Sequence, residues 1–410
     1  MRILFLTPQL PYPPRQGTQI RNFHLLRAAS STHEVDLLSF ARPGEAFSGT
    51  GPLRELCGEV QLIPAPLRTR QERVRTLVAS PDPDMAHRLR SEGLAAMLRA
   101  MLERGRYDAV QVAGIEMARY IPIVRKTVPG TRVVFDDHNA EYLLQGRAAE
   151  VDAHHPPSWP KAVYSLIQWR KLRSYEARLC RVADAVLAVS EDDAAAIRSL
   201  GGTAPVFVVP NGVDTEYYRP NPSQSPRPAT LLFTGTMDFR PNVDAVRWFV
   251  ADVLPLLAER RPDVRLDIVG RSPAPAVQRL ASSAVSVTGA VDDVRPYFER
   301  ASLYVVPMRM GGGVRLKILE ALAMGLPLVS TSMGAEGAGL THGKELLIAD
   351  TAAQFAQAIL SLLDDPALRT RLAKAGRETA RARFEWGRIA PRLLDVYRGI
   401  LEQVEPPARS

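Results

Sequence analysis

The stretch Gly311-Gly312-Gly313-Val314-Arg315-Leu316-Lys317-Ile318-Leu319-Glu320-Ala321 joins a run of glycines to a helical pattern. Free backbone N–H groups at the start of a helix, together with the positive end of the helix dipole, attract phosphate groups. Arg315 and Lys317 would add charge-assisted contacts with a diphosphate, and Glu320 could accept hydrogen bonds from sugar hydroxyls. We therefore expect a nucleotide-sugar site here. Taken alone, the stretch also fits a glycine-rich turn into an ordinary amphipathic helix.

Short β-rich runs alternate with helical patterns along the whole chain, which is typical of βαβ units built on parallel sheets. The strands that we predict in the first half are residues 3–6, 35–40, 61–63, 109–112, 132–135, 185–189 and 206–209. Those predicted in the second half are residues 231–234, 266–269, 285–288, 303–306, 328–330 and 346–348. The pattern predicts an α/β fold with two doubly wound, Rossmann-like domains.

A Pro-rich stretch, residues 220–228, separates the two series of strands. The fixed φ angle and missing N–H of proline suit a linker better than a regular element. We expect an N-terminal domain over residues 1–214, an interdomain linker over 215–228 and a C-terminal domain over 229–386. The last helical pattern, about residues 388–404, either packs on the second domain or returns to the first. We expect residues 387–410 to return towards the N-terminal domain.

Composition excludes several classes of protein. With 410 residues, of which 46% are hydrophobic and 23% charged, the chain suits a soluble globular protein of two domains. No apolar run approaches the roughly 20 residues of a membrane-spanning helix, and the apolar start is too short for the core of a signal peptide. Two cysteines are too few for a disulfide framework. We expect a cytoplasmic protein.

The net charge of +8 is spread along the chain. Basic residues are not interleaved with aromatic ones, so we do not expect nucleic acid as a partner. A phosphate-bearing substrate or an anionic membrane surface fits a diffuse positive charge. Residues 67–78 and 162–181 are basic helical patterns with an apolar side. Either their apolar side chains pack in the core, which is our first interpretation for the second helix, or both helices rest on anionic headgroups and the protein makes peripheral membrane contact.

Other kinds of site find little support. Asp82-Pro83-Asp84 has the spacing of a metal-binding Asp-x-Asp motif, but it does not follow a predicted strand, so we expect no metal there. No Gly-x-Gly-x-x-Gly follows the first strand, which argues against a dehydrogenase or an epimerase. No serine stands in a nucleophile elbow.

Further motifs follow one another in a characteristic order. They are the glycine-containing loop 13–21, then residues 33–35, 136–139, 183–190 and 209–214, and in the second half residues 233–236, 269–270 and 287–289. Together with the glycine run, these motifs resemble the GT-B glycosyltransferases, and within them the retaining enzymes of glycosyltransferase family 4 (group 1). The resemblance covers nearly the whole chain.

The resemblance implies two Rossmann-like domains facing across a cleft, with the donor on the second domain and the acceptor on the first. It implies transfer, with retention, of a hexose-type residue from a nucleotide-diphosphate sugar to a glycan or lipid-linked glycan. No cofactor and no metal are expected. The leading biological context is assembly of a surface polysaccharide, either exopolysaccharide or lipopolysaccharide. The protein would work in the cytoplasm or at the inner face of the cell membrane.

The motifs also assign residues to roles. His138 is expected near the reacting carbon, with Asp137 beside it as an orienting or acceptor-binding group, and the alternative is a histidine that caps a strand end. Asn139 and Glu141 are acceptor-side candidates. The residues expected to bind the donor are Gly17, Gly235, Arg240, Gly313, Arg315, Lys317 and Glu320. Gly17 would let the backbone approach the phosphates closely.

Two departures from the family pattern concern the donor. Gly312 stands where the family often has a glutamate that contacts the donor sugar. The stretch Asp238–Asn242 stands where a donor-phosphate lysine is usual, so Arg240, Arg315 and Lys317 are the cations available instead. These departures leave two alternatives open: a catalytically silent GT-B protein that binds a sugar nucleotide, and a GT-B sugar-nucleotide epimerase.

Overall fold

A computed structural model describes residues 1–42, 51–153, 159–224 and 226–402. The chain divides into two compact units. Unit 1 comprises residues 1–210 and 389–410, and unit 2 comprises residues 211–388. Each unit contains a parallel β-sheet between helices, so the predicted α/β fold with two Rossmann-like domains is confirmed.

The described part of unit 1 contains a seven-stranded parallel sheet with the order β3-β2-β1-β4-β5-β6-β7. The central strands β1, β4 and β5 are buried almost throughout, which explains their continuous apolar runs. The strands are β1 (Arg2–Thr7), β2 (Glu34–Ala41), β3 (Val60–Pro64), β4 (Ala109–Ala113), β5 (Arg132–Asp136), β6 (Ala185–Ala188) and β7 (Val206–Val208).

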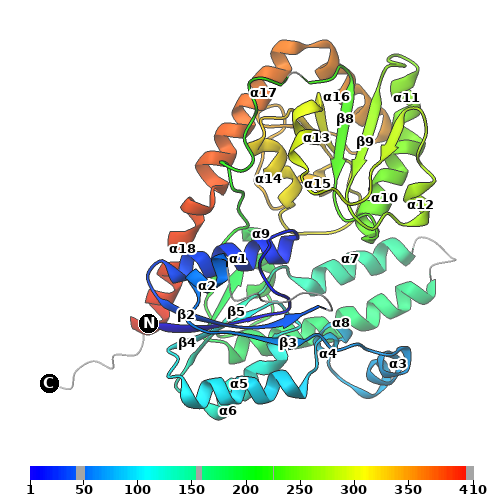
Figure 1. The fold of residues 1–410 in the computed structure, drawn as a ribbon. Coiled ribbons are helices and arrows are strands. Elements are labelled where there is room, and N and C mark those ends of the chain that lie inside the picture. The colour runs from blue at the N-terminus through cyan, green and yellow to red at the C-terminus, as the bar shows by residue number, and fades with distance from the viewer. Residues whose placement is uncertain (43–50, 154–158, 225, 403–410) are drawn as a thin grey trace. The chain divides into compact units, whose positions relative to one another are not determined.

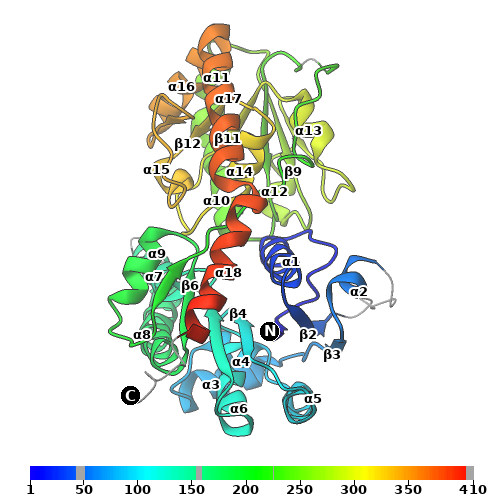
Figure 2. The same cartoon turned by 90° about the vertical axis from the view of Figure 1, so that its left-hand side faces the viewer.

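Helices cover both faces of this sheet. Figures 1 and 2 show α1 on one face and α5 and α6 on the other, as right-handed crossovers require when the chain winds in both directions from β1. The helices before α18 are α1 (Gly17–Ser30), α2 (Pro52–Leu56), α3 (Arg70–Ala79), α4 (Asp84–Arg88), α5 (Glu92–Arg104), η1 (Ala118–Tyr120), α6 (Ile121–Thr127), α7 (Glu141–Ala153), α8 (Trp159–Val182) and α9 (Glu191–Arg198).

The described part of unit 2 contains a six-stranded parallel sheet with the order β10-β9-β8-β11-β12-β13. Its strands are β8 (Thr230–Thr234), β9 (Arg265–Val269), β10 (Val285–Val287), β11 (Leu303–Val306), β12 (Leu328–Ser330) and β13 (Leu347–Ile348). Its helices are α10 (Arg240–Trp248), η3 (Phe249–Val253), α11 (Leu254–Ala258), α12 (Pro275–Gln278), α13 (Arg295–Arg300), α14 (Leu316–Ala323), α15 (Ser332–Ala335), α16 (Ala352–Asp364), α17 (Pro366–Thr379) and η4 (Ala380–Phe384).

The strand order reverses beside the first strand of each sheet, between β1 and β4 in unit 1 and between β8 and β11 in unit 2. At such a switch point the loops that follow the two strands leave in opposite directions, and the crevice between them is where open α/β sheets bind ligands. The loops after β4 and β5, and those after β8 and β11, therefore position the candidate site residues described below.

The last helix, α18 (Trp386–Glu402), belongs to unit 1 from Ile389 onwards. Tyr397 is completely buried in unit 1, and its hydroxyl donates a hydrogen bond to Gln111 of β4. Residues 403–410, the end of the segment that we expected to return, lie outside the described residues. No helix in the described ranges is long and apolar enough to cross a membrane.

The predicted linker, residues 215–228, falls within unit 2. The Thr215 N–H donates to Glu385 at 3.0 Å, and the Arg227 N–H donates to the Arg300 carbonyl at 2.8 Å. Tyr218 is half-buried, with its ring against Phe298. These contacts attach the segment to the rest of unit 2, which begins at Asn211, before the predicted boundary. Ser225 lies outside the described residues.

Candidate functional site

The glycine run lies between β11 and α14, at the switch point of unit 2. Gly311 and Gly313 have φ angles of 118° and 71°, which residues other than glycine rarely adopt. Arg315 ends this loop in an extended conformation, and α14 begins directly after it. The glycines therefore make the sharp turn that brings the first residues of α14 to the carboxyl ends of β8 and β11.

Lys317, on the first turn of α14, reaches the loop that follows β8. Its Nζ donates a hydrogen bond to Asn242 Oδ1 at 2.8 Å and lies 4.0 Å from the centre of the Phe233 ring. A Cβ atom on Gly235 would lie 3.0 Å from this Nζ and 2.7 Å from Asn242 Nδ2. The structure therefore brings the predicted residues Gly235 and Lys317 together, and the contact requires a glycine at position 235.

Glu320 lies one turn further along α14, where the Tyr218 hydroxyl donates to its Oε1 at 3.3 Å. Burial raises the pKa of Glu320 to about 7, although the Tyr218 hydrogen bond and the attraction of Lys317 act to lower it. Burial also lowers the pKa of Lys317 to about 7, with a further contribution from Arg315, while Glu320 acts to raise it. Both side chains can therefore change charge near neutral pH.

The other predicted donor residues occupy different positions around Lys317. Arg315 folds back over its own loop, because its Nη1 donates to the Gly312 carbonyl at 2.6 Å and a Cβ on Gly311 would lie 2.5 Å from its Nη2. Gly313 lies within the same loop. Arg240 is the first residue of α10 and is exposed. The hydrogen bond from Lys317 to this helix goes to Asn242 instead.

Sequence reasoning did not assign a role to Asn242 or Arg271. Asn242 accepts from Lys317 and donates to the Thr236 carbonyl at 2.9 Å, so it connects α14 with the loop after β8. Arg271 follows β9, and its Nε lies 3.5 Å from Thr236 Oγ1. The sequence did contain an indication of Arg271, because this cation directly follows Gly270 at the end of a predicted strand. Asn242 carries no charge, and no motif marked it.

In unit 1, His138 lies just beyond the end of β5, beside the loop that follows β4. Its Nε2 is 3.5 Å from Asp136 Oδ2. A Cβ on Gly114 would lie 3.4 Å from its Nδ1. The last residue of β5 and the loop after β4 thus hold the imidazole from two sides.

Asp136 is itself held by Arg21 of α1. The Arg21 Nη2 and Nε atoms donate to the carboxylate at 2.6 and 3.0 Å, and Nη1 donates to the Val209 carbonyl at 2.8 Å. Both residues are buried. Burial acts to raise the pKa of Asp136, but the charge of Arg21, followed by that of His138, holds this pKa well below its usual range. Asp136 is therefore an ionised group that lies beside His138.

Asp137 does not occupy the position that we expected. It is 1% exposed, and its Oδ1 has no hydrogen-bond partner within the described residues. Burial, followed by repulsion from Glu176, raises its pKa well above the usual range. Since neighbouring residues at the end of a strand point in different directions, Asp136 takes the place beside His138 and Asp137 turns into the interior.

The acceptor-side candidates lie close to one another. Asn139 Nδ2 donates to Glu141 Oε1 at 3.3 Å. Burial, followed by repulsion from Glu116, raises the pKa of Glu141 to about 7. Glu116 follows β4 and comes close to the same Gly114 position that contacts His138. Sequence reasoning missed Glu116, which stands in a loop without a recognisable motif.

Two further predictions from the sequence concern Gly17 and the Asp82-Pro83-Asp84 stretch. Gly17 is exposed and is the first residue of α1, the helix that carries Arg21. Asp84 forms an ion pair with Arg68 at 2.9 Å, and Asp82 pairs with Arg178. Within the described ranges, no three His, Cys, Asp or Glu residues are grouped so that they could hold a metal ion.

Comparison with protein-family models gives two matches. Residues 16–217 match Glycosyltransferase Family 4, and residues 228–365 match Glycosyl transferases group 1. Among curated proteins, the chain is 26% identical over 332 residues to a GDP-mannose-dependent α-(1-6)-phosphatidylinositol monomannoside mannosyltransferase of Mycobacterium tuberculosis, covering 71% of this chain and 86% of that protein. It is 29% identical over 243 residues to glycogen synthase of the same organism, covering 56% of this chain and only 57% of that protein.

Solved structures share the fold. Sucrose-phosphate synthase from Thermosynechococcus elongatus superposes with a TM-score of 0.71 at 18% identity, over 98% of this chain and 100% of that chain. HepE from Anabaena, solved in complex with UDP and glucose, superposes with a TM-score of 0.64 at 17% identity, over 97% of this chain and 99% of that chain. The two parallel-sheet units therefore have the GT-B fold.

Proposed function

Because the chain belongs to the glycosyltransferases of the family 4 (group 1) type, which use nucleotide-sugar donors, we propose that it transfers a hexose-type residue, with retention, to a glycan or lipid-linked glycan. The observation that carries this proposal is the cluster of Gly235, Asn242, Lys317 and Glu320 at the switch point of unit 2. A cation, a close backbone approach and a carboxylate are what a nucleotide diphosphate attached to a sugar requires.

The roles within this cluster follow from charge. Negative charge grows on the diphosphate as the bond to the sugar breaks, and Lys317 and Arg315 would stabilise that charge. The N–H groups at the start of α14 would add their dipoles. Glu320 would accept hydrogen bonds from ribose hydroxyls in its ionised form, which a neighbouring ammonium favours.

In unit 1 we assign His138 to the reacting end of the sugar. Asp136 would keep the imidazole in place and favour a proton on the nitrogen that faces it. Asn139, Glu141 and Glu116 would bind acceptor hydroxyls, because a carboxyl group with a raised pKa can donate as well as accept a hydrogen bond.

We also propose that transfer needs no metal ion. Lys317, Arg315 and Arg271 all stand at the loops after β8, β9 and β11 and could neutralise a diphosphate that a divalent cation would otherwise bind. Retained activity in the presence of a chelator is the expected result.

The acceptor and its location are part of the same proposal. The mycobacterial mannosyltransferase named above acts on a phosphatidylinositol mannoside, which supports a lipid-linked acceptor for this chain. We propose that the protein works at the inner face of the cell membrane, as a peripheral protein, in the assembly of a surface polysaccharide such as exopolysaccharide or lipopolysaccharide.

A thermal-shift screen against UDP-, GDP-, ADP- and dTDP-sugars, with and without EDTA, tests the proposed donor site. Stabilisation by one donor, equal in both conditions, is expected. That donor is then incubated with the protein alone and with lipid-linked glycan extracts. Sugar transfer only when the acceptor is present supports the proposal, whereas conversion of the donor alone to an epimer would contradict it.

A further inference from the structure

The first half of α8 turns its apolar side chains towards solvent. Trp159 and Val163 are each 59% exposed, Leu166 is 41% and Ile167 is 37% exposed. Their spacing places them on one face of the helix. On the opposite face, Ser165 and Gln168 are buried. This polarity is the reverse of that in a helix packed on a core.

The second half of α8 turns its apolar side chains towards the core. The apolar stripe that we predicted here consists of Trp169, Leu172, Tyr175 and Leu179. The last three are buried in unit 1, and Trp169 is half-buried against the same core. Our first interpretation of that stripe, packing in the core, is confirmed. The exposed stripe is a different one, formed by residues nearer the start of the helix.

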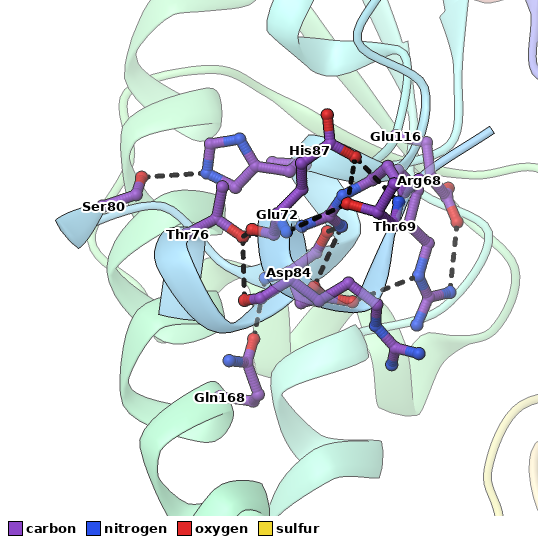
Figure 3. Close-up of polar contacts among 12 residues, drawn as sticks. Arg68, Thr69, Glu72, Thr76, Ser80, Asp84, His87, Glu116 and Gln168 are labelled. Carbon is purple, nitrogen blue, oxygen red and sulfur yellow. Dashed lines mark hydrogen bonds and ion pairs between the residues drawn. The ribbon is translucent and has the colours of Figure 1, made fainter. Parts of the chain in front are cut away.

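Helix α3 exposes a second set of apolar side chains. None of its residues is buried, and Val74 and Val78 are 63% and 83% exposed, with Leu67 at 89% just before the helix. Polar contacts hold the helix instead: Arg68 donates to Asp84 at 2.9 Å and to Thr76 at 2.6 Å (Figure 3). The apolar side of α3 therefore makes little contribution to the packing of unit 1.

The two helices are neighbours. Lys171 Nζ of α8 donates to the Leu77 and Ser80 carbonyls at 2.6 and 2.7 Å, at the end of α3. The Asp84 N–H donates to Gln168 Oε1 of α8 at 2.8 Å, as Figure 3 shows. We call the exposed side chains of the two helices the α3/α8 face: Leu67, Arg70, Val74, Arg75, Val78, Trp159, Lys161, Val163, Leu166, Ile167 and Arg170.

The charge of the two helices around this face is predominantly positive. Between Trp159 and Tyr175 the sequence has Lys161, Arg170, Lys171 and Arg173 but no Asp or Glu. Helix α3 carries Arg70, Arg73 and Arg75 against a single acidic residue. Exposed aliphatic and indole groups surrounded by arginine and lysine suit the boundary between the headgroups and acyl chains of an anionic bilayer.

A cavity of about 450 Å³ continues the exposed side of α8 beyond this stripe. It is lined by Trp169, Arg170, Arg173, Ser174, Ala177 and Leu200. Two guanidinium groups beside an indole provide charge-assisted donors and a flat apolar wall, which fit a phosphate-bearing headgroup.

We propose that the α3/α8 face docks the protein on a bilayer that contains anionic lipids. The inference rests on the proposed function, since docking would bring a lipid-linked acceptor to the enzyme. It also assigns the peripheral membrane contact of the proposed function to a specific surface of unit 1. Nucleic acid fits this face less well, because its exposed apolar groups are mostly aliphatic and cannot stack on bases.

Sedimentation with vesicles tests the face without requiring transfer. The protein is mixed with phosphatidylcholine vesicles, alone or with about 30% phosphatidylglycerol, at low and high salt. Binding to the anionic vesicles that weakens as salt rises is expected. Absence of binding, or equal binding to both compositions, would overturn the proposal.

Two double variants separate the contribution of charge to vesicle binding from that of the apolar side chains. Arg70→Gln with Arg75→Gln should weaken binding to anionic vesicles about tenfold or more, and Val74→Ser with Val78→Ser should weaken it by a similar factor. The matched control, Arg99→Gln with Arg106→Gln, removes two exposed arginines elsewhere in unit 1 and should retain the binding of the unmodified protein. Equal binding by all three variants would remove the α3/α8 face from the interaction.

Trp159 provides a direct readout of insertion. Trp169 lines the adjoining cavity, so the measurement uses a Trp169→Phe background. There the fluorescence should be quenched by lipids brominated in the acyl chains, and the quenching should disappear when Trp159→Phe is added. Quenching that persists in this double variant would overturn the proposed orientation. Donor binding measured in the same preparations without vesicles separates the two proposals, because the donor cluster lies in unit 2 and should be unaffected by every variant of the face.

Discussion

The two candidate sites contain similar residue types at the ends of parallel strands, yet their charges behave differently. In unit 1, Arg21 and Asp136 form a buried ion pair in which the pKa of the carboxyl is held well below its usual range. In unit 2, Lys317 and Glu320 bond the neutral side chains of Asn242 and Tyr218, and burial brings the pKa of each to about 7. A paired charge fixes geometry, whereas a charge poised near neutrality can respond to a ligand. If the proposed roles hold, unit 1 provides fixed charges at the reacting end of the sugar and unit 2 provides responsive charges at the donor diphosphate.

Removing one member of the buried pair should have the largest effect. Arg21→Ala leaves Asp136 as an uncompensated buried charge, which typically costs about 3–5 kcal/mol of unfolding free energy. Urea denaturation followed by circular dichroism measures the loss. Lys317→Ala serves as the contrast and should destabilise the protein much less. Similar losses in both variants would contradict the distinction between fixed and responsive charges.

The next effect concerns His138. His138→Ala should lower the transfer rate about a hundredfold, within the range expected for a group that acts on the reacting atoms, while leaving donor affinity unchanged. Radiolabelled transfer and calorimetric donor titration measure the two quantities separately. Asp136→Asn should lower transfer as well, because the imidazole loses its orienting carboxylate. Full turnover in His138→Ala would exclude the assigned role.

A smaller effect is expected at Gly235. In Gly235→Ala the new Cβ would lie 2.7 Å from Asn242 Nδ2 and 3.0 Å from Lys317 Nζ, so the hydrogen bond between these side chains must shift. We expect about tenfold weaker donor binding, equivalent to the loss of one good polar contact. Gly130→Ala is the matched control, since its Cβ would meet no atom within 4 Å. Equal affinity in both variants would show that the close approach is not needed.

The smallest effect is a dependence on pH. Because the pKa of Lys317 is lowered to about 7, about half of the free protein carries the ammonium at that pH. A bound diphosphate favours the charged form, so at pH 7 Lys317 should take up about half a proton on binding, and the affinity should weaken a few-fold as pH rises above 7. Titration of a nucleotide sugar in two buffers with different ionisation enthalpies measures the proton uptake. Lys317→Arg, which is always charged, should show less uptake; an unchanged value would assign the proton elsewhere.

The general fold could be predicted from the sequence because it depends on hydrophobic patterns that extend over whole strands. The glycine turn into α14 could also be predicted, since a run of glycines and a lysine on the first turn of a helix are local features of the sequence. Asn242 could not, because its contacts with Lys317 and Thr236 depend on how α14, α10 and the loop after β8 meet in the folded chain. Arg271 was marked only by its place directly after Gly270. The sequence alone also did not distinguish Asp136 from Asp137, whose difference lies only in the direction in which each side chain leaves β5.

The predicted linker and the exposed side of α8 show the same limit. Prolines in residues 220–228 indicated a linker, and the sequence did not show that Thr215 and Arg227 donate hydrogen bonds within unit 2. In α8, both stripes have helical spacing, and the spacing alone does not determine which of them faces the core. Burial depends on the neighbouring elements, and these are known only from the folded chain.

The most direct test of the central claim is calorimetric titration of the preferred nucleotide sugar, in EDTA, into the unmodified protein, Lys317→Ala and Lys374→Ala. Lys374 is an exposed lysine of α17 in the same unit, so it controls for the loss of one positive charge. We predict that Lys317→Ala binds about tenfold or more weakly, since a hydrogen bond to a charged group contributes about 1.5–3 kcal/mol, and that Lys374→Ala binds like the unmodified protein. Equal affinity in all three would contradict the placement of the donor diphosphate at the switch point of unit 2.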